Sequence, residues 1–143
     1  MPCLIFTDTS ALIAAVVVDD RYHREAQRAE AALRSAREQL WTIDSVLTEL
    51  WIQLRRFVGH ARADQLVIGL LDRGLRREPV EPEDYSRGWE IGREWPDQRL
   101  SLTDRQAFAV MERTRRYAAW SYDDDFAVIR LGRPRARAID LVR

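Results

Sequence analysis

The sequence predicts an α/β fold with a mainly parallel sheet, because short apolar segments alternate with longer segments of helical composition. The length of 143 residues suits one domain, and hydrophobic residues make up 46% of the chain, enough to form a buried core. No internal repeat and no low-complexity linker interrupts the pattern. We therefore expect residues 1–143 to form a single domain.

The first half of the chain predicts two strands, each followed by a pair of helices. Residues 22–39 are rich in Ala, Arg and Glu, which favour a helix. Asp44 or Ser45 is positioned to cap the next helix, and Gly59 to end it. In chain order we expect a strand at 4–6, helices at 11–18 and 22–39, a strand at 40–43, and helices at 46–58 and 61–75.

The second half predicts three short strands and two helices. Pro96 is expected to stop the first of these helices. Thr103 and Gln106 have the spacing of a capping box, with Thr103 as the N-cap of the second. In chain order we expect a short strand at 78–80, helices at 83–95 and from 103 to about 117, and strands at 118–122 and 138–142. Residues 132–137 are expected to form an arginine-rich loop.

Charge and composition exclude several classes of function. The 23 basic and 23 acidic side chains cancel, so a binder that depends on bulk positive charge is excluded. All basic residues are arginine, which excludes a P-loop lysine and Schiff-base chemistry. Cys3 is the single cysteine and His23 and His60 are the two histidines, so an internal disulfide and a Cys- or His-rich metal site are excluded. No apolar run approaches the roughly 20 residues of a membrane span, and no signal peptide is evident, so we expect a cytoplasmic protein that binds no membrane.

Four acidic residues occupy positions from which they could converge. Asp8 and Asp123 directly follow expected strands, Asp104 follows a loop, and Glu49 lies on the helix after the second strand. Ligands of parallel sheets bind beyond the carboxyl ends of the strands. Each acid also has a structural explanation, because an Asp at a helix N-terminus can cap it and Glu49 could be solvated at the edge of an apolar face.

Convergence of these acids would require cations. Two carboxylates about 4 Å apart repel by roughly 4 kcal/mol at an effective dielectric constant of 20. A set of ligands made only of oxygen atoms suits Mg²⁺ and Mn²⁺ rather than zinc or copper. Divalent ions in such a cluster would activate a water molecule and hold a phosphodiester.

The acidic motifs occur in the order found in one known family. They are Phe6-Thr7-Asp8-Thr9-Ser10-Ala11-Leu12, Leu47-Thr48-Glu49-Leu50, Ser101-Leu102-Thr103-Asp104 and Ser121-Tyr122-Asp123-Asp124-Asp125-Phe126. With them the chain resembles a PIN domain, and most closely the VapC-type toxins of bacterial toxin–antitoxin pairs. The resemblance extends from Leu4 to Val142. It implies a three-layer α/β/α sandwich and an endoribonuclease that depends on Mg²⁺ or Mn²⁺.

The resemblance also implies roles for individual residues. Asp8, Glu49, Asp104 and Asp123 match the four acidic positions of the family, and Asp8, Asp104, Asp123 and Asp125 are the implied metal ligands. Ser121 and Thr9 are implied auxiliary residues. Whether Asp123 or Asp125 is the main fourth acid is left open, and Asp123 is preferred because it stands three residues before Phe126, as in the family pattern.

Arginines and tryptophans are the remaining candidates for RNA contact. Arg130, Arg133, Arg135 and Arg137 could bind RNA phosphates, or they could form a solvated loop. The five tryptophans could stack on bases, or they could anchor the core or an interface.

The resemblance finally implies partners: an RNA substrate, a cognate antitoxin and a second copy of the chain in a homodimer. Two alternatives stay open. One is a non-catalytic PIN-like module that binds metal or a partner. The other is a nuclease that processes RNA outside any toxin system.

Overall fold

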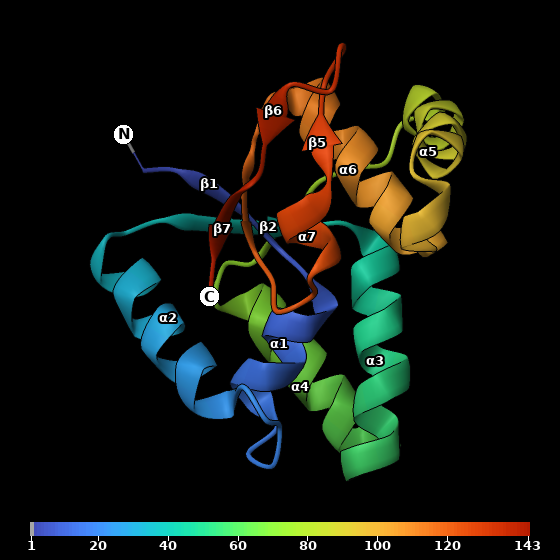
Figure 1. The fold of residues 1–143 in the computed structure, drawn as a ribbon. Coiled ribbons are helices and arrows are strands. Elements are labelled where there is room, and N and C mark those ends of the chain that lie inside the picture. The colour runs from blue at the N-terminus through green and yellow to red at the C-terminus, as the bar shows by residue number, and fades with distance from the viewer. Residues whose placement is uncertain (1) are drawn as a thin grey trace.

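A parallel five-stranded sheet forms the centre of the protein (Figure 1). The computed structural model describes residues 2–143. The strand order is β3-β2-β1-β4-β7, and every neighbouring pair is parallel. These strands are β1 (Leu4–Thr7), β2 (Gln39–Thr42), β3 (Arg76–Arg77), β4 (Ala118–Trp120) and β7 (Asp140–Val142). The predicted mainly parallel sheet is confirmed.

Helices fill the segments between the strands and cover both faces of the sheet. They are α1 (Thr9–Val16), α2 (His23–Ser35), α3 (Asp44–Val58), α4 (His60–Asp72), α5 (Pro82–Glu94), α6 (Leu102–Thr114) and α7 (Asp125–Val128), with a 3₁₀ turn at Pro96–Gln98. The predicted helices are present, and none of their ends differs from the prediction by more than four residues. The short α7 and the antiparallel pair of β5 (Arg130–Leu131) and β6 (Arg137–Ala138) were not predicted.

Three local predictions were wrong. The N-cap of α3 is Ile43 rather than Asp44 or Ser45, because the helix already includes Asp44 as its first residue. The strand expected at 78–80 lies two residues earlier, because Arg76 and Arg77 pair with Trp41 and Thr42 in β2. The N-cap of α6 is Ser101 rather than Thr103, since the Ser101 hydroxyl accepts a hydrogen bond from the backbone N–H of Asp104 at 3.1 Å.

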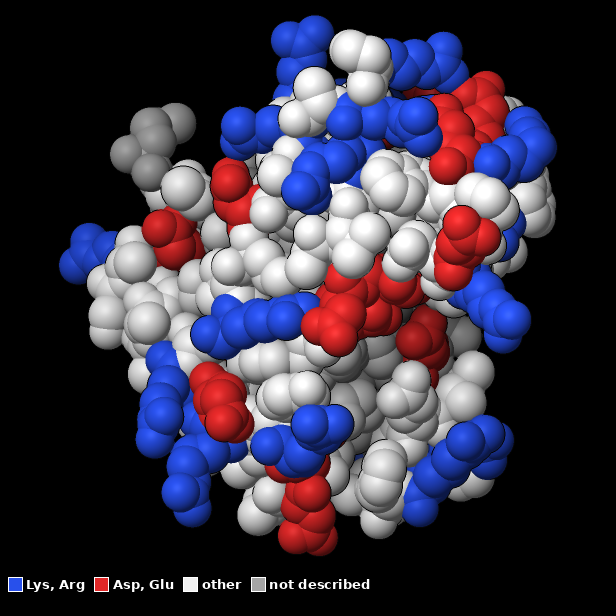
Figure 2. All heavy atoms as spheres, viewed as in Figure 1, with Lys and Arg blue, Asp and Glu red and all other residues white. Residues whose placement is uncertain are grey.

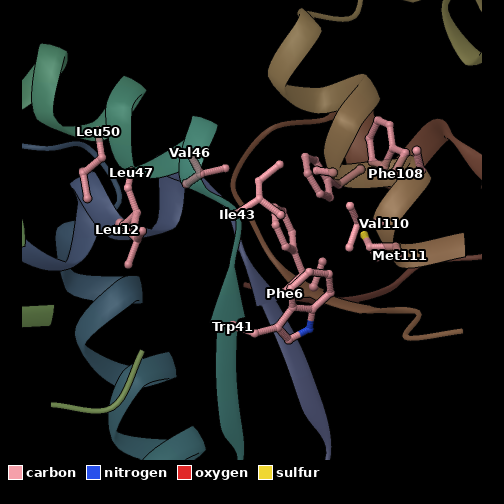
Figure 3. Packing of buried hydrophobic residues seen from close by; sticks show 14 of the residues in the cluster. Phe6, Leu12, Trp41, Ile43, Val46, Leu47, Leu50, Phe108, Val110 and Met111 are labelled. Atoms are coloured by element: carbon pink, nitrogen blue, oxygen red, sulfur yellow. The ribbon is translucent and has the colours of Figure 1, made fainter. Parts of the chain in front are cut away.

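Alternating side chains of the strands pack on opposite faces of the sheet. In β1, Ile5 contributes to a cluster formed with α1 and α2, whereas Phe6 contributes to the larger cluster on the other side. Figure 3 shows Phe6 and Trp41 packed against side chains of α6, including Phe108 and Met111. Burial on both faces confirms the three-layer sandwich and explains the continuous apolar runs of the strands.

The order of strands reverses between β1 and β4. The chain moves from β1 to β2 and β3 on one side, and then to β4 and β7 on the other. The carboxyl ends of β1 and β4 adjoin, because the backbone N–H of Asp8 donates to the Trp120 carbonyl at 3.1 Å. In parallel sheets this reversal is where ligands bind.

Within residues 2–143, no helix combines the length and the apolar character needed to cross a membrane.

Candidate active site

Asp8 lies at the point where the strand order reverses. It follows β1 and is the N-cap of α1, but its side chain makes no capping hydrogen bond to the helix. The residue is 5% exposed. Its Oδ2 accepts hydrogen bonds from the hydroxyls of Ser10 at 2.8 Å and Ser121 at 2.9 Å. The carboxylate is therefore held by two hydroxyl groups through one oxygen, and its Oδ1 receives neither of these bonds.

Ser10 and Ser121 connect α1 to the loop after β4. Their hydroxyl oxygens lie 3.2 Å apart. The Ser10 hydroxyl accepts from the backbone N–H of Tyr122 at 2.9 Å, and the Ser121 hydroxyl accepts from that of Asp123 at 3.0 Å. Ser121 was predicted as an auxiliary residue, whereas Ser10 was missed. Its position two residues after Asp8, in the first turn of a helix, was the signal that could have identified it.

Three further carboxyl groups gather beside Asp8. One oxygen each of Asp104, Asp123 and Asp125 lies within 4.8 Å of the others. Asp104 comes from the first turn of α6, Asp123 from the loop after β4, and Asp125 from the start of α7. Figure 2 shows acidic side chains gathered near the centre of this face, beside the region where α7 meets α1 in Figure 1. Asp123 and Asp125 lie in the same group, so geometry does not select one of them.

Burial and mutual repulsion raise the pKa values of these acids. Burial raises the pKa of Asp8, and the charge of Asp123 adds to the rise, although the hydroxyls of Ser10 and Ser121 oppose it. The pKa of Asp104 is raised to about 7 by burial and then by the charges of Asp8, Asp123 and Glu49. Burial and the charge of Asp123 also raise the pKa of Asp125. The group is therefore unfavourable in the fully ionised state without a compensating positive charge.

Glu49 lies on α3 at the edge of the acidic group. Burial is the main cause of its raised pKa, and the charges of Asp8 and Asp123 contribute, while the neighbouring hydroxyls of Thr103 and Thr9 lower it. Thr9 is 3% exposed, and its Oγ1 lies near Glu49 without reaching hydrogen-bonding geometry toward any described residue. The predicted acids Asp8, Glu49, Asp104 and Asp123 thus come together from four segments of the chain.

Arg143 is a second residue that the sequence did not reveal. It follows β7, and its guanidinium donates to the carbonyls of Ser121 at 3.2 Å and Asp123 at 3.0 Å. It also pairs with Asp124 at 3.1 Å. The Arg143 side chain therefore stabilises the loop that carries Asp123. The pairing of β7 with β4 places Arg143 beside the loop after β4. No local pattern in the sequence predicts that pairing.

The arginines proposed to contact RNA lie outside the acidic group. Arg133 forms an ion pair with Glu90, and the Arg135 guanidinium lies over the Trp95 ring at 5.5 Å. Arg130 donates to backbone carbonyls of α7 and the residue after it, Ala127 among them at 3.3 Å. These contacts hold the β5–β6 hairpin to the rest of the protein. A role in RNA binding stays a prediction.

Comparison with known proteins identifies the family. A family model described as PIN domain matches residues 5–131. A crystal structure of VapC20 from Mycobacterium tuberculosis, described as a sarcin–ricin loop cleaving toxin, is 28% identical with a TM-score of 0.77. That similarity covers 87% of this chain and 93% of VapC20. No curated protein matches the sequence.

Two more distant structures share the fold. DNA-bound VapBC from Salmonella typhimurium is 14% identical with a TM-score of 0.61, covering 87% of this chain and 89% of its own. VapBC2 from Rickettsia felis, bound to a fragment of its promoter DNA, is 11% identical with a TM-score of 0.61, covering 85% and 88%. The resemblance drawn from the acidic motifs is confirmed. Because the matched segment spans most of the chain and includes all four predicted acids, this chain belongs to the PIN domain family.

Proposed function

We propose that this protein is an endoribonuclease that depends on Mg²⁺ or Mn²⁺ and acts as the toxin of a toxin–antitoxin pair. The observation that carries the proposal is the convergence of Asp8, Glu49, Asp104 and Asp123 at the reversal of strand order. The similarity to VapC20, which is described as an RNA-loop-cleaving toxin, supports both the nuclease activity and the toxin role.

The acidic group fits a hard divalent cation. Asp104, Asp123 and Asp125 offer oxygens within 4.8 Å of one another, and Asp8 lies close enough to raise the pKa of Asp104. The raised pKa values of Asp8 and Asp104 indicate that the ionised group needs positive charge. A set of carboxylates without His or Cys suits Mg²⁺ or Mn²⁺. When bound there, the cation would lower the pKa of a water molecule and neutralise charge on the phosphodiester.

The residues of the chain hold this arrangement in place before substrate arrives. The hydroxyls of Ser10 and Ser121 fix the orientation of the Asp8 carboxylate, and Arg143 fixes the loop that carries Asp123. Glu49 lies at the edge of the group, where its raised pKa suits a carboxylate that accepts a proton from water. Such preorganised positioning is a large part of phosphodiester catalysis.

We also propose a protein antitoxin and a second copy of the chain as partners. Support for the antitoxin comes from the resemblance to VapC toxins and from the VapBC structures with the same fold. Exposed large apolar side chains on the α1–α2 loop and on α3, α4 and α5 are available for such contacts, among them Val18, Phe57, Ile68, Tyr85 and Trp89.

Cleavage of defined RNAs by the purified protein tests the proposal. The panel contains single-stranded oligonucleotides and a hairpin with the sarcin–ricin loop, each incubated with Mg²⁺, Mn²⁺ or EDTA. We expect cleavage with either metal, none with EDTA, and a loss of at least about 100-fold in Asp8→Asn and Asp104→Asn. Asp72→Asn removes an exposed carboxylate at the end of α4 and serves as the matched control.

The outcomes separate the proposal from its alternatives. Metal binding without cleavage of any RNA, in folded protein free of antitoxin, would support a non-catalytic binding module. Cleavage that persists in EDTA, or in both site variants, would contradict the metal-dependent mechanism. Cleavage without growth arrest when the protein is produced in cells would support an RNA-processing nuclease rather than a toxin.

A further inference from the structure

A groove runs along α3 away from the acidic group. It is lined by residues of one helix face together with the start of α6, and we call it the α3 groove: Ser45, Thr48, Glu49, Ile52, Gln53, Arg56 and Thr103. Glu49 belongs to both the acidic group and the groove. The groove is therefore continuous with the candidate active site.

The helical repeat places a basic group at a set distance from the acids. Glu49, Gln53 and Arg56 occupy positions i, i+4 and i+7 and so share one face of α3. At about 1.5 Å rise per residue, Arg56 lies roughly 10 Å along the helix axis from Glu49. Phosphates of a stacked strand are spaced at about 3.4 Å along the axis, so Arg56 lies about three nucleotides from the acids.

The Arg56 side chain is free to bind an anion. It is exposed, and among the described residues no carboxylate lies within ion-pair distance of it. Its neighbour Arg55 lies on a different face of α3, where its guanidinium is 6.0 Å from the Trp51 ring centre. Arg56 is the one basic residue that lines the groove.

The other groove residues offer hydrogen bonds rather than apolar contacts. Among the described residues, the Gln53 side chain makes only a long hydrogen bond of 3.5 Å to Glu49. Thr48, whose hydroxyl donates to the Asp44 carbonyl at 3.1 Å, is exposed. Ile52 is the one exposed large apolar residue in the groove. Hydroxyl and amide groups beside one cation fit a sugar–phosphate strand better than the apolar anchor of a protein segment.

We propose that the α3 groove binds the RNA strand on one side of the cleaved bond, with Arg56 contacting a phosphate about three nucleotides away. This inference rests on the proposed function. RNA is a polyanion, and a cation held by the acids reaches the cleaved phosphodiester but not the phosphates several nucleotides away, so these need a separate positive charge. Arg56 supplies it about two helical turns along α3 from Glu49, which borders the acidic group.

Arg56→Gln tests the proposal, with Arg55→Gln as the matched control on the same helix. Both variants are compared in an Asp8→Asn background, which is not expected to cut RNA, by fluorescence anisotropy with a labelled 12-nucleotide single-stranded RNA. Each phosphate contact contributes about 0.7 to the slope of log affinity against log salt for a single strand. We expect Arg56→Gln to reduce this slope by about 0.7, and Arg55→Gln to leave it unchanged within error.

Cleavage kinetics in the otherwise wild-type protein give a second readout. A phosphate contact that is equal in the ground and transition states changes KM and leaves kcat nearly constant. We expect Arg56→Gln to raise KM about two- to fivefold, as for an exposed charge pair, and Arg55→Gln to leave it unchanged. Circular dichroism checks that both variants are folded.

The results also distinguish failure of this inference from failure of the proposed function. If the wild type cleaves RNA but the two variants have identical salt slopes and KM values, the proposal that the groove binds RNA is overturned and the proposed nuclease activity stands. That result is also the one expected if the groove binds a protein segment instead. If RNA binds without being cleaved, and the salt slope is reduced only in Arg56→Gln, the proposal that the groove binds RNA is supported and the proposed nuclease activity is overturned. If the wild type neither binds nor cleaves RNA, the groove proposal and the nuclease proposal are both overturned.

Discussion

At Asp8, two hydroxyl groups hold one oxygen of the carboxylate in place. Ser10 and Ser121 both donate to Oδ2, and both also accept backbone N–H bonds from the loop after β4. We expect Ser10→Ala and Ser121→Ala each to weaken metal binding and cleavage about 10- to 100-fold, the range found for groups that orient metal ligands. Calorimetric titration with Mn²⁺ and measurement of kcat/KM check this.

Ser86→Ala is the control for these serine variants. Ser86 is exposed on α5, and no side-chain hydrogen bond involves it among the described residues. Metal affinity in Ser10→Ala and Ser121→Ala equal to that of Ser86→Ala would show that orientation of Asp8 does not matter for metal binding.

Asp104 makes the stability of the metal-free protein depend on pH. Its pKa is raised from 3.8 to about 7 in the folded state, by burial and by the charges of Asp8 and Asp123. Between these two values the folded state binds more protons than the unfolded state, so the free energy of unfolding falls as pH rises. We therefore expect the Tm in EDTA to fall as the pH rises from about 4 to about 7, with little further fall from this group above about pH 8, as thermal melting followed by circular dichroism will measure.

Asp104→Asn separates this effect from other titrating groups. The variant keeps the shape of the side chain but cannot ionise, so we expect a smaller fall in Tm over the same range. Every other ionisable group is unchanged in the variant, so its contribution is the same in both proteins. An equal fall in Tm in both proteins would contradict the assignment to Asp104.

At the scale of elements, α5 and α6 pack closely through two glycines of α5. A Cβ added at Gly88 would meet Arg105 at 3.5 Å, an ordinary contact, whereas one added at Gly92 would lie 2.6 Å from the Arg105 guanidinium. Arg105 also donates to the Leu100 carbonyl at 2.9 Å, which anchors the segment before α6. Gly92 thus leaves space for a side chain that positions the helix carrying Asp104.

The two glycines form a matched pair of variants. Alanine in a helix is favoured over glycine by about 1 kcal/mol, so we expect Gly88→Ala to be neutral or stabilising. We expect Gly92→Ala to be about 1 kcal/mol less stable than Gly88→Ala, because Arg105 must move and lose its bond to Leu100. Urea unfolding measures the difference, and equal free energies of unfolding would contradict the close approach.

Elements with strong periodic patterns were predictable, whereas short or ambiguous ones were not. Two overlapping capping patterns precede α6, one beginning at Ser101 and one at Thr103. The structure places Ser101 at the cap and Thr103 near Glu49, a choice that depends on tertiary position. β5 and β6 contain two residues each, too few to show any alternation.

At the scale of the whole molecule, the acids could be predicted because parallel strands bring distant residues to one edge. Asp8 and Asp123 each follow a strand, so their proximity required only that the two strands pair, as β1 and β4 do. Arg143 and the α3 groove could not be predicted in the same way. The position of Arg143 depends on β7 joining the edge of the sheet. The α3 groove depends on α3 lying beside the start of α6.

The same convergence predicts that the folded state is stabilised by metal. The acids come together from the junction between β1 and α1, from α3, from α6 and from the loop after β4, so the unfolded chain lacks the site and binds the ion weakly. A ligand that binds only the folded state at 100 times its Kd stabilises by about 2.7 kcal/mol. At pH 7.5 we expect saturating Mn²⁺ to raise the Tm by several degrees and Asp104→Asn or Asp123→Asn to remove most of that rise. Ca²⁺ and monovalent salt at matched ionic strength separate site binding from general screening. A rise in Tm that is equal in wild type and both variants would place the bound ion elsewhere and remove the physical basis for a metal-dependent nuclease at this edge of the sheet.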